Sequence, residues 1–419
     1  MQVNLSTLPN GLRVITVERP QTETVSLGLW VNTGSAYEPE AMNGVSHFVE
    51  HMVFKGTKKR NTAQIWEDIE NVGGSTNAYT SREFTVFYAK MLKNDIELAI
   101  DVLADLVMAP TFDATEMAKE KEVVIQEIKQ TNDDPSDIVF DYFQETAFAN
   151  QALGRSILGP AEKVRKFDST TLRTYMAHNY AAENIVVAAV GNLDHQKFVQ
   201  MVNERMASLQ AKTSFTPDKQ IYTGGMFAKQ RDIEQAQVLL GFPGIAYGSE
   251  QYYHATILST IFGGSMSSRL FQEIREKRGL VYSVYSFTNA HIESGLFGIY
   301  AGLDAEQIPC YLPVVAEEIK KISNDLVSDK EFNRVKVQLK ASVLMALESS
   351  SSTAEVIARQ QLIHKRNLPI AEIVERIDSV TKEDIRTMAQ QIFGGKLTYT
   401  LLGNLNKYPS YDEMQKMIG

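Results

Sequence analysis

The chain has 419 residues, of which 44% are hydrophobic, and its formal net charge at pH 7 is −9. At about 100–200 residues per domain this length suggests two domains, and the apolar fraction excludes a disordered or fibrous chain. The acidic balance argues against a nucleic-acid-binding surface, which is usually basic. Without a run of about 18 apolar residues, no membrane-spanning helix is expected. No signal or transit segment precedes the first structural pattern, so the sequence predicts a cytoplasmic protein.

The predicted elements of the first half mix strands and helices. In chain order they are strands at 11–18 and 24–32, helices at 44–55 and 61–74, strands within 77–91, helices at 94–110 and 113–130, and a buried strand within 183–193. Strands are recognised by β-branched and aromatic residues between turn signals, and helices by apolar residues at a spacing of three to four. The predicted fold class is therefore α+β.

Two shorter features are read as structural. The lone cysteine, Cys310, cannot form an internal disulfide, and its apolar neighbours predict a buried thiol. The stretch "GTKKR" at 56–60 reads as a solvated basic turn.

The second half of the chain repeats the first. "NIVVAAVGNL" ends one unit and "KLTYTLLGNL" ends the other, which aligns Gly191 with Gly403. "HFVEHMVFKG" aligns with "HATILSTIFGG" near the start of each unit. The repeat is too long for a solenoid and predicts two tandem homologous αβ domains. We expect them at 1–214 and 228–419, joined by a polar linker at 215–227 that contains Pro and Gly.

The second copy serves as an internal comparison for the polar residues of the first. The first copy has His47, Glu50, His51, Glu120 and Glu127 where the second has His254, Ile257, Leu258, Val335 and Ser342. Residues needed only for folding would be needed in both copies. The second copy has mostly apolar residues at the equivalent positions, which indicates a functional set in the first.

This set has the composition of a zinc site. On a helix, His47 and His51 are four residues apart and share one face, with Glu50 beside them. A catalytic zinc takes three protein ligands and keeps one position open. Glu120 and Glu127, seven residues apart on the predicted helix 113–130, share a face, so one can ligate while the other supports it.

The alternative is a chance HxxEH string on a solvated helix face. The downstream carboxylates and the altered second copy favour the metal site. The other histidines have no partner at ligand spacing and are read as structural or surface residues: His178, His195, His254, His291 and His364. The chemistry this site suggests is metal-assisted hydrolysis, in which zinc activates a water and Glu50 transfers its proton.

With "HFVEH" followed by "EKEVVIQE", the sequence resembles the pitrilysin/insulinase family of inverted zinc metallopeptidases. Within that family it is most similar to the β subunit of the mitochondrial processing peptidase and its single-chain bacterial relatives. The resemblance implies one zinc per chain held by His47, His51 and Glu127, with Glu50 as general base and Glu120 in support. It also implies two domains facing each other around a substrate cavity.

Further family positions match. "GGSTNAYTSREFTVF" resembles the substrate strand, which implies that an extended peptide adds to the sheet edge near Asn77 and Ala78. A plain hairpin would explain the same glycines. "REKRGLVYSVYSF" resembles the segment whose Arg and Tyr reach the substrate, here Arg275 and Tyr282. Tyr282 is then a donor to the developing oxyanion.

The helix "SDIVFDYFQETAF" resembles the processing-peptidase segment that binds an arginine just before the cut. The matching residues, Asp137 and Asp141, are one helical turn apart and suit a guanidinium. A solvated acidic helix face is the alternative. "FGGSMSSRLF" lacks the GK[ST] ending of a phosphate loop, which argues against nucleotide binding.

The sequence thus predicts a zinc endopeptidase that cleaves extended, presequence-like peptides with an arginine near the cut. Peptide is the expected partner and a homodimer is compatible with the family, whereas nucleic acid and membrane are not expected. Two alternatives stay open: a non-catalytic structural subunit resembling the core proteins of respiratory complexes, and a catalytic subunit that needs an inactive partner. The intact metal positions disfavour the first alternative, and Arg275 and Tyr282 in the same chain disfavour the second.

Overall fold

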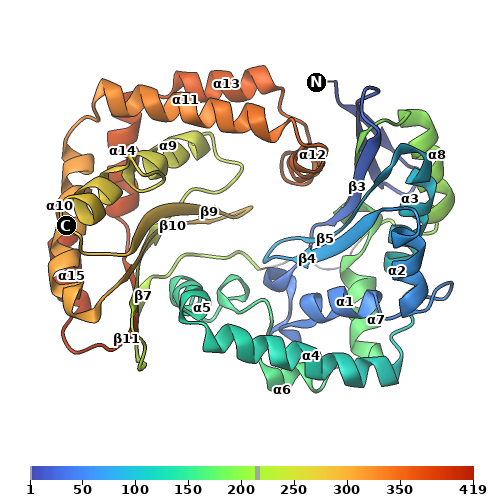
Figure 1. The fold of residues 1–419 in the computed structure, drawn as a ribbon, viewed down its shortest axis with the longest axis horizontal. Coiled ribbons are helices and arrows are strands. Elements are labelled where there is room, and N and C mark those ends of the chain that lie inside the picture. The colour runs from blue at the N-terminus through green and yellow to red at the C-terminus, as the bar shows by residue number, and fades with distance from the viewer. Residues whose placement is uncertain (1, 213–217) are drawn as a thin grey trace. The chain divides into compact units, whose positions relative to one another are not determined.

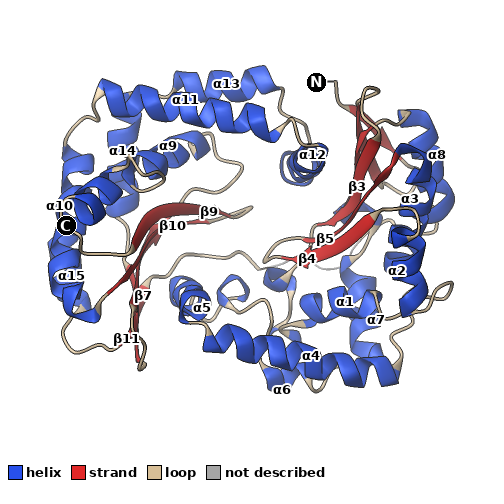
Figure 2. Ribbon diagram, in the orientation of Figure 1, coloured by secondary structure: helices blue, strands red, loops and turns tan. Residues whose placement is uncertain are grey.

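The computed structural model describes residues 2–212 and 218–419 and confirms a mixed α+β fold with two sheets (Figure 2). The first sheet has the strand order β1-β2-β6-β3-β5-β4. Its strands are β1 (Asn4–Thr7), β2 (Arg13–Glu18), β3 (Thr24–Val31), β4 (Ser75–Thr80), β5 (Thr85–Leu92) and β6 (Ile185–Gly191). The second sheet has the order β7-β11-β8-β10-β9. Its strands are β7 (Gly225–Gln230), β8 (Ala236–Pro243), β9 (Ser283–Ala290), β10 (Gly295–Leu303) and β11 (Thr398–Gly403).

Helices separate these strands along the chain and follow the last of them. Those of the first half are α1 (Val45–Val53), α2 (Thr62–Glu70), α3 (Ile96–Met108), α4 (Ala114–Asp133), α5 (Pro135–Ala147), α6 (Ala161–Val164), α7 (Ser169–Asn179) and α8 (His195–Met206). Those of the second half are α9 (Tyr252–Phe262), a π-helix (Phe271–Glu276), α10 (Ile308–Asn324), α11 (Asp329–Ala346), α12 (Ser350–His364), α13 (Ile370–Ser379), α14 (Lys382–Phe393) and α15 (Tyr411–Ile418). None of the helices in residues 2–212 and 218–419 is long and apolar enough to cross a lipid bilayer.

The two sheets share one topology, which confirms the duplication. Strands β2-β6-β3-β5-β4 of the first sheet correspond in order to β7-β11-β8-β10-β9 of the second. In each sheet the first pair of this series is parallel and the others are antiparallel. Gly191 ends β6 at φ 147° and Gly403 ends β11 at φ 152°, a backbone conformation that favours glycine. The repeated glycines therefore mark the same strand end in both copies.

The chain folds into two compact units that exchange segments. Unit 1 comprises residues 1–129, 156–218 and 343–370, and unit 2 comprises residues 130–155, 219–342 and 371–419. Helix α12, late in the chain and coloured red, accordingly lies beside the blue strand β3, and α5 lies beside β7 and β11 (Figure 1). The predicted linker 215–227 lies partly outside the described residues, and its last three residues belong to β7, which begins at Gly225. Helices α5 and α12 cross the division between the predicted repeats 1–214 and 228–419. The domain limits 1–214 and 228–419 therefore remain a prediction of where each sequence repeat begins and ends.

Helix α12 is fixed to the first sheet by polar contacts. The Trp30 indole on β3 donates to the Glu355 carboxylate over 2.6 Å, and the Ser26 and Ser351 hydroxyls lie 3.0 Å apart. Arg13 on β2 donates to the Gln361 carbonyl over 2.8 Å. The opposite face of this sheet packs against α1, α3 and α8, where the core of unit 1 is formed (Figure 2).

Two of the smaller sequence predictions are wrong. Cys310 is exposed, because α10 turns Ile308, Tyr311 and Leu312 inward and leaves Cys310 on the opposite side. The basic stretch at 56–60 is not simply solvated, because the Arg60 side chain is only 12% exposed.

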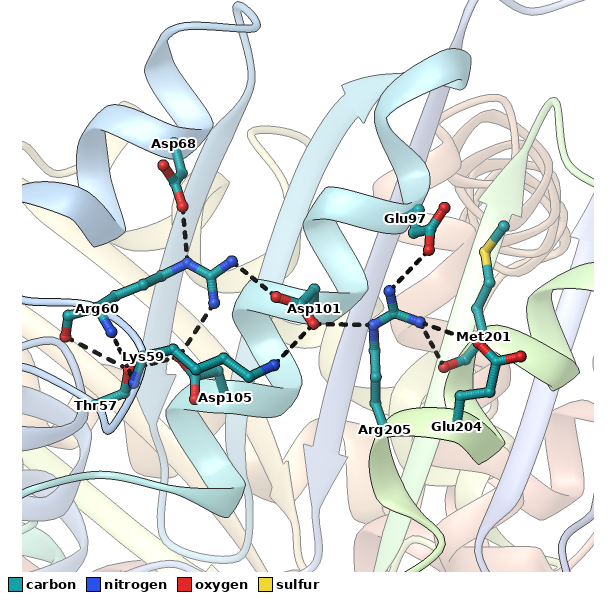
Figure 3. Close-up of polar contacts among 10 residues, drawn as sticks. All are labelled: Thr57, Lys59, Arg60, Asp68, Glu97, Asp101, Asp105, Met201, Glu204 and Arg205. Carbon is teal, nitrogen blue, oxygen red and sulfur yellow. Dashed lines mark hydrogen bonds and ion pairs between the residues drawn. The ribbon is translucent and has the colours of Figure 1, made fainter.

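Arg60 is the centre of an ion-pair network that attaches the segment after α1 to α2 and α3 (Figure 3). Its guanidinium contacts Asp68 at 2.7 Å, Asp101 at 2.7 Å and Asp105 at 3.1 Å. Asp101 is shared with Arg205 of α8, at 3.2 Å. Burial alone would raise the pKa of Asp101, but its hydrogen bonds from basic side chains lower it. The network therefore connects the segment after α1 to α2 and α3, and through Asp101 to α8.

Candidate metal centre

The N-terminus of helix α1 is hydrogen-bonded to the buried carboxylate of Glu38. The side chain of Glu38 accepts the backbone N–H groups of Gly44 and Ser46, each over 2.7 Å, and the amide of Asn43 over 3.0 Å. The first N–H groups of a helix lack partners within it, and a negative charge there is favourable. Burial raises the pKa of Glu38, while these hydrogen bonds oppose the rise. Glu38, which the sequence did not single out, thus fixes where α1 starts.

The rest of α1 is positioned by its apolar face. Phe48, Val49 and Met52 are fully buried in the core of unit 1, and α1 contacts β4 and α7. The opposite face presents His47, which is buried, and His51, which is partly exposed. The prediction that the two histidines share one helical face is confirmed by the structure of α1.

Three potential ligands converge between α1 and α4, which lie side by side (Figure 1). His47 Nε2 and His51 Nε2 are 3.2 Å apart, and each faces one oxygen of Glu127, at 3.5 and 3.6 Å. A zinc bound at about 2.0–2.1 Å by tetrahedral ligands separates them by about 3.3–3.5 Å. The observed spacings therefore suit one zinc ion. Within the described ranges this is the sole group of three His, Cys, Asp or Glu side chains close enough to share a metal.

Glu120 supports the group from two turns before Glu127 on α4. Its Oε1 lies 2.8 Å from His51 Nδ1, and its Oε2 lies 2.7 Å from Lys55 Nζ. Burial alone would raise the pKa of Glu120, but the contacts with His51 and Lys55 lower it, so the carboxylate is charged. A charged Glu120 accepts the Nδ1 proton of His51 and leaves the Nε2 lone pair for a metal. Lys55 was missed in the sequence, although it lies four residues after His51.

We expect the substitution Lys55→Met to weaken zinc binding by up to about 10-fold, the lower end of the range for removing an outer partner of a metal ligand, because Lys55 acts through Glu120. Methionine keeps much of the apolar stem but leaves Glu120 with one partner in place of two. Competition with a chromophoric chelator measures the affinity. The control is Lys58→Met on the exposed turn after α1. Equal zinc affinity in both variants would contradict this role of Lys55.

Glu50 lies on the same helix but outside the ligand group. One of its oxygens, Oε2, accepts the hydroxyl of Thr80 at the end of β4 over 2.6 Å. The side chain is partly exposed, one residue before His51. This places a carboxylate beside the three potential ligands, where a general base is needed if a metal-bound water is to be deprotonated.

The chain is similar to known proteins over nearly its whole length. A family model described as "Insulinase (Peptidase family M16)" matches residues 13–161, and one described as "Peptidase M16 inactive domain" matches residues 166–339. A Bacillus subtilis protein named "Uncharacterized zinc protease YmxG" is 36% identical, over 96% of this chain and 99% of that protein.

This chain belongs to the M16 (insulinase) peptidase family. A second relative of the M16 chain, a Streptomyces coelicolor protein also named a zinc protease, is 37% identical over 96% of this chain and 90% of that protein. Two solved structures share the fold. A protease from Helicobacter pylori aligns with a TM-score of 0.88 at 21% identity, over 96% of this chain and 99% of that one. A Pseudomonas fluorescens structure titled as a peptidase M16 inactive domain gives 0.91 at 20% identity, over 98% and 100%.

In the M16 chain, Asn77 and Ala78 lie on β4, the last strand of the first sheet, which pairs with β5 on one side. Asn77 is exposed, and its side-chain oxygen accepts the backbone N–H of Ala78 over 2.8 Å. The other edge of β4 is the end of the sheet, where a strand can add. Asn77 and Ala78 therefore lie on an edge strand, as predicted; binding of an extended peptide there stays a prediction.

The remaining candidates belong to unit 2. Arg275 lies on the π-helix and Tyr282 just before β9, and both are exposed. The Arg275 guanidinium lies 6.0 Å from the Tyr282 ring, so the structure brings these two together. Asp137 and Asp141 lie one turn apart on α5; Asp137 is exposed and Asp141 partly buried.

Proposed function

We propose that this chain is a zinc-dependent endopeptidase in which His47, His51 and Glu127 bind one zinc and Glu50 is the general base. The observation that carries the proposal is the convergence of three ligand atoms at spacings that suit zinc, in a family of peptidases. When bound, zinc acts as a Lewis acid and lowers the pKa of a bound water toward neutrality. Glu50 would accept the proton of a water held there and donate it to the leaving amine. Glu120 holds His51 in the orientation and tautomer that ligation requires.

Extended peptides are the proposed substrate. Strand β4, which carries Asn77 and Ala78, is the end strand of its sheet, and pairing with a sheet edge suits an unfolded segment better than a folded protein. In line with the resemblance to the processing peptidase, we assign substrate contact to Arg275 and Tyr282. Recognition of an arginine near the cut is assigned to Asp137 and Asp141, whose spacing on α5 supports a bidentate contact.

Two alternative functions predict different residues at the candidate site or different activity of the isolated chain. A non-catalytic structural subunit has no need of a complete ligand set with its base, and this set is complete. A catalytic subunit that requires an inactive partner would be inert alone. We propose a self-sufficient enzyme, in the cytoplasm, for which a homodimer is compatible with the family; light scattering on the purified chain measures its mass.

The test is to map cleavage sites in a peptide library by mass spectrometry, using zinc-reconstituted protein with and without a chelator. We expect zinc bound at about one per chain, cleavage that the chelator abolishes and zinc restores, and arginine enriched near the cut. The double variant Asp137→Asn with Asp141→Asn is expected to lose that enrichment. A reconstituted chain without bound zinc would refute the peptidase function, and unchanged cleavage statistics in the double variant would refute the arginine assignment alone.

A further inference from the structure

The contact between Glu50 and Thr80 joins the proposed base to the strand proposed to bind peptide. Thr80 is the last residue of β4 and pairs with Thr85 of β5. Its hydroxyl donates to Glu50 Oε2 over 2.6 Å, a short hydrogen bond of the kind that carboxylates accept. Because a hydroxyl carries one proton, this bond commits the Thr80 donor to Glu50.

The backbone around Thr80 is held from two directions. Ser81 and Phe84 close the turn after β4, where the Ser81 backbone N–H and hydroxyl both donate to the Phe84 carbonyl, over 2.7 and 3.0 Å. The segment after β3 then binds this turn, since Ala36 N–H donates to the Arg82 carbonyl over 2.8 Å. The Thr80 hydroxyl is therefore presented from a fixed position.

Glu50 needs such a fixed partner. A glutamate has three side-chain torsions, and fixing a side chain of this length costs rotamer entropy. Its helix fixes the backbone but not the carboxylate. The hydrogen bond with Thr80 occupies Oε2 and leaves Oε1 for a proton. A catalytic group misplaced by about 1 Å can lower the rate by about 100-fold.

We propose that Thr80 is a positioning residue that orients the carboxylate of Glu50 for proton transfer and ties that orientation to strand β4. This inference rests on the proposed peptidase function. Strand β4 would then have two roles: its edge binds the peptide, and the side chain of its last residue, Thr80, orients the general base. Local sequence gave no sign of this, because the contact depends on how α1 packs against β4.

The test compares Thr80→Val with Thr80→Ser. Valine keeps the β-branched shape and removes the hydroxyl, whereas serine keeps the donor. For Thr80→Val we expect kcat to fall roughly 10- to 100-fold, with KM and zinc affinity within about twofold of the wild type. Thr80→Ser is expected to recover most of kcat. Zinc affinity is measured by chelator competition, independently of activity. The control is Thr256→Val on α9, a partly buried threonine that donates to the Tyr252 carbonyl.

The results of these experiments distinguish a failure of the positioning role of Thr80 from a failure of the proposed peptidase function. A Thr80→Val enzyme with unchanged kcat would overturn the positioning role. So would a fall in kcat matched by a loss of zinc affinity, because that pattern indicates a structural defect, or a Thr80→Ser enzyme as slow as Thr80→Val. A wild-type chain that shows no zinc-dependent cleavage would overturn the proposed function itself, and the inference with it.

Discussion

Replacing Glu50 by glutamine is expected to abolish peptide hydrolysis while the protein still binds one zinc. The amide has the shape of the carboxylate, and its oxygen still accepts the Thr80 hydroxyl, but it cannot take a proton from water. Loss of a general base lowers rates by about 10²- to 10⁴-fold. The measurements are kcat/KM on a fluorogenic peptide and the zinc content by elemental analysis.

The matched control for Glu50→Gln is Glu122→Gln, which removes the same charge from an exposed position on α4. It is expected to keep full activity. Two results would count against the assignment of the base: substantial activity in the Glu50→Gln protein, or loss of its zinc. The second result would mean that Glu50 is needed to build the metal centre and not only to use it.

Replacing Arg60 by methionine is expected to destabilise unit 1 by about 3–5 kcal/mol, the range for breaking a buried ion pair by removing one partner. Asp105, whose side chain is 1% exposed, would keep its charge without the guanidinium 3.1 Å away. Asp101 and Asp68 are more exposed, so water replaces Arg60 there at little cost. The loss therefore comes mainly from Asp105.

Tryptophan fluorescence during urea denaturation measures this effect selectively, because the two tryptophans, Trp30 and Trp66, both lie in unit 1. The matched control is Lys59→Met. Lys59 also contacts Asp101, at 3.1 Å, but its side chain is 59% exposed, so about 0–1 kcal/mol is expected. Equal urea midpoints for the two variants would show that the network around Arg60 does not stabilise the unit.

The part of the candidate site that lies within one helix was predictable from the sequence. The spacing of His47 and His51 requires only that residues 45–53 form a helix, which they do. Glu127 lies on another helix, and the choice between it and Glu120 as a ligand came from the family resemblance. Glu38 and Thr80 were missed because their contacts depend on tertiary packing, which no spacing along the chain encodes.

The fold was predictable to a similar degree. The repeated glycines, Gly191 and Gly403, correctly indicated a duplicated sheet. The exchange of α5 and α12 between units was not foreseen, because an amphipathic pattern tells how much of a helix is buried but not against which sheet. Cys310 was placed wrongly for a related reason: apolar neighbours in sequence lie on different sides of a helix.

The exchange of α12 has a consequence for how the protein is made. Strand β6 is the strand of the first sheet that is synthesised last, and it ends at Gly191; α12 begins at Ser350, which is 350 − 191 = 159 residues later. At about 5–20 residues per second, a ribosome needs on the order of 10–30 s to synthesise that stretch. During that time the face of β3 that carries Trp30 has no helix to cover it. On that face Trp30 pairs with Val186, and Ala188 lies beside them, both fully buried in the folded protein. The nascent chain thus displays apolar residues of the kind that chaperones bind until most of the second repeat has been translated.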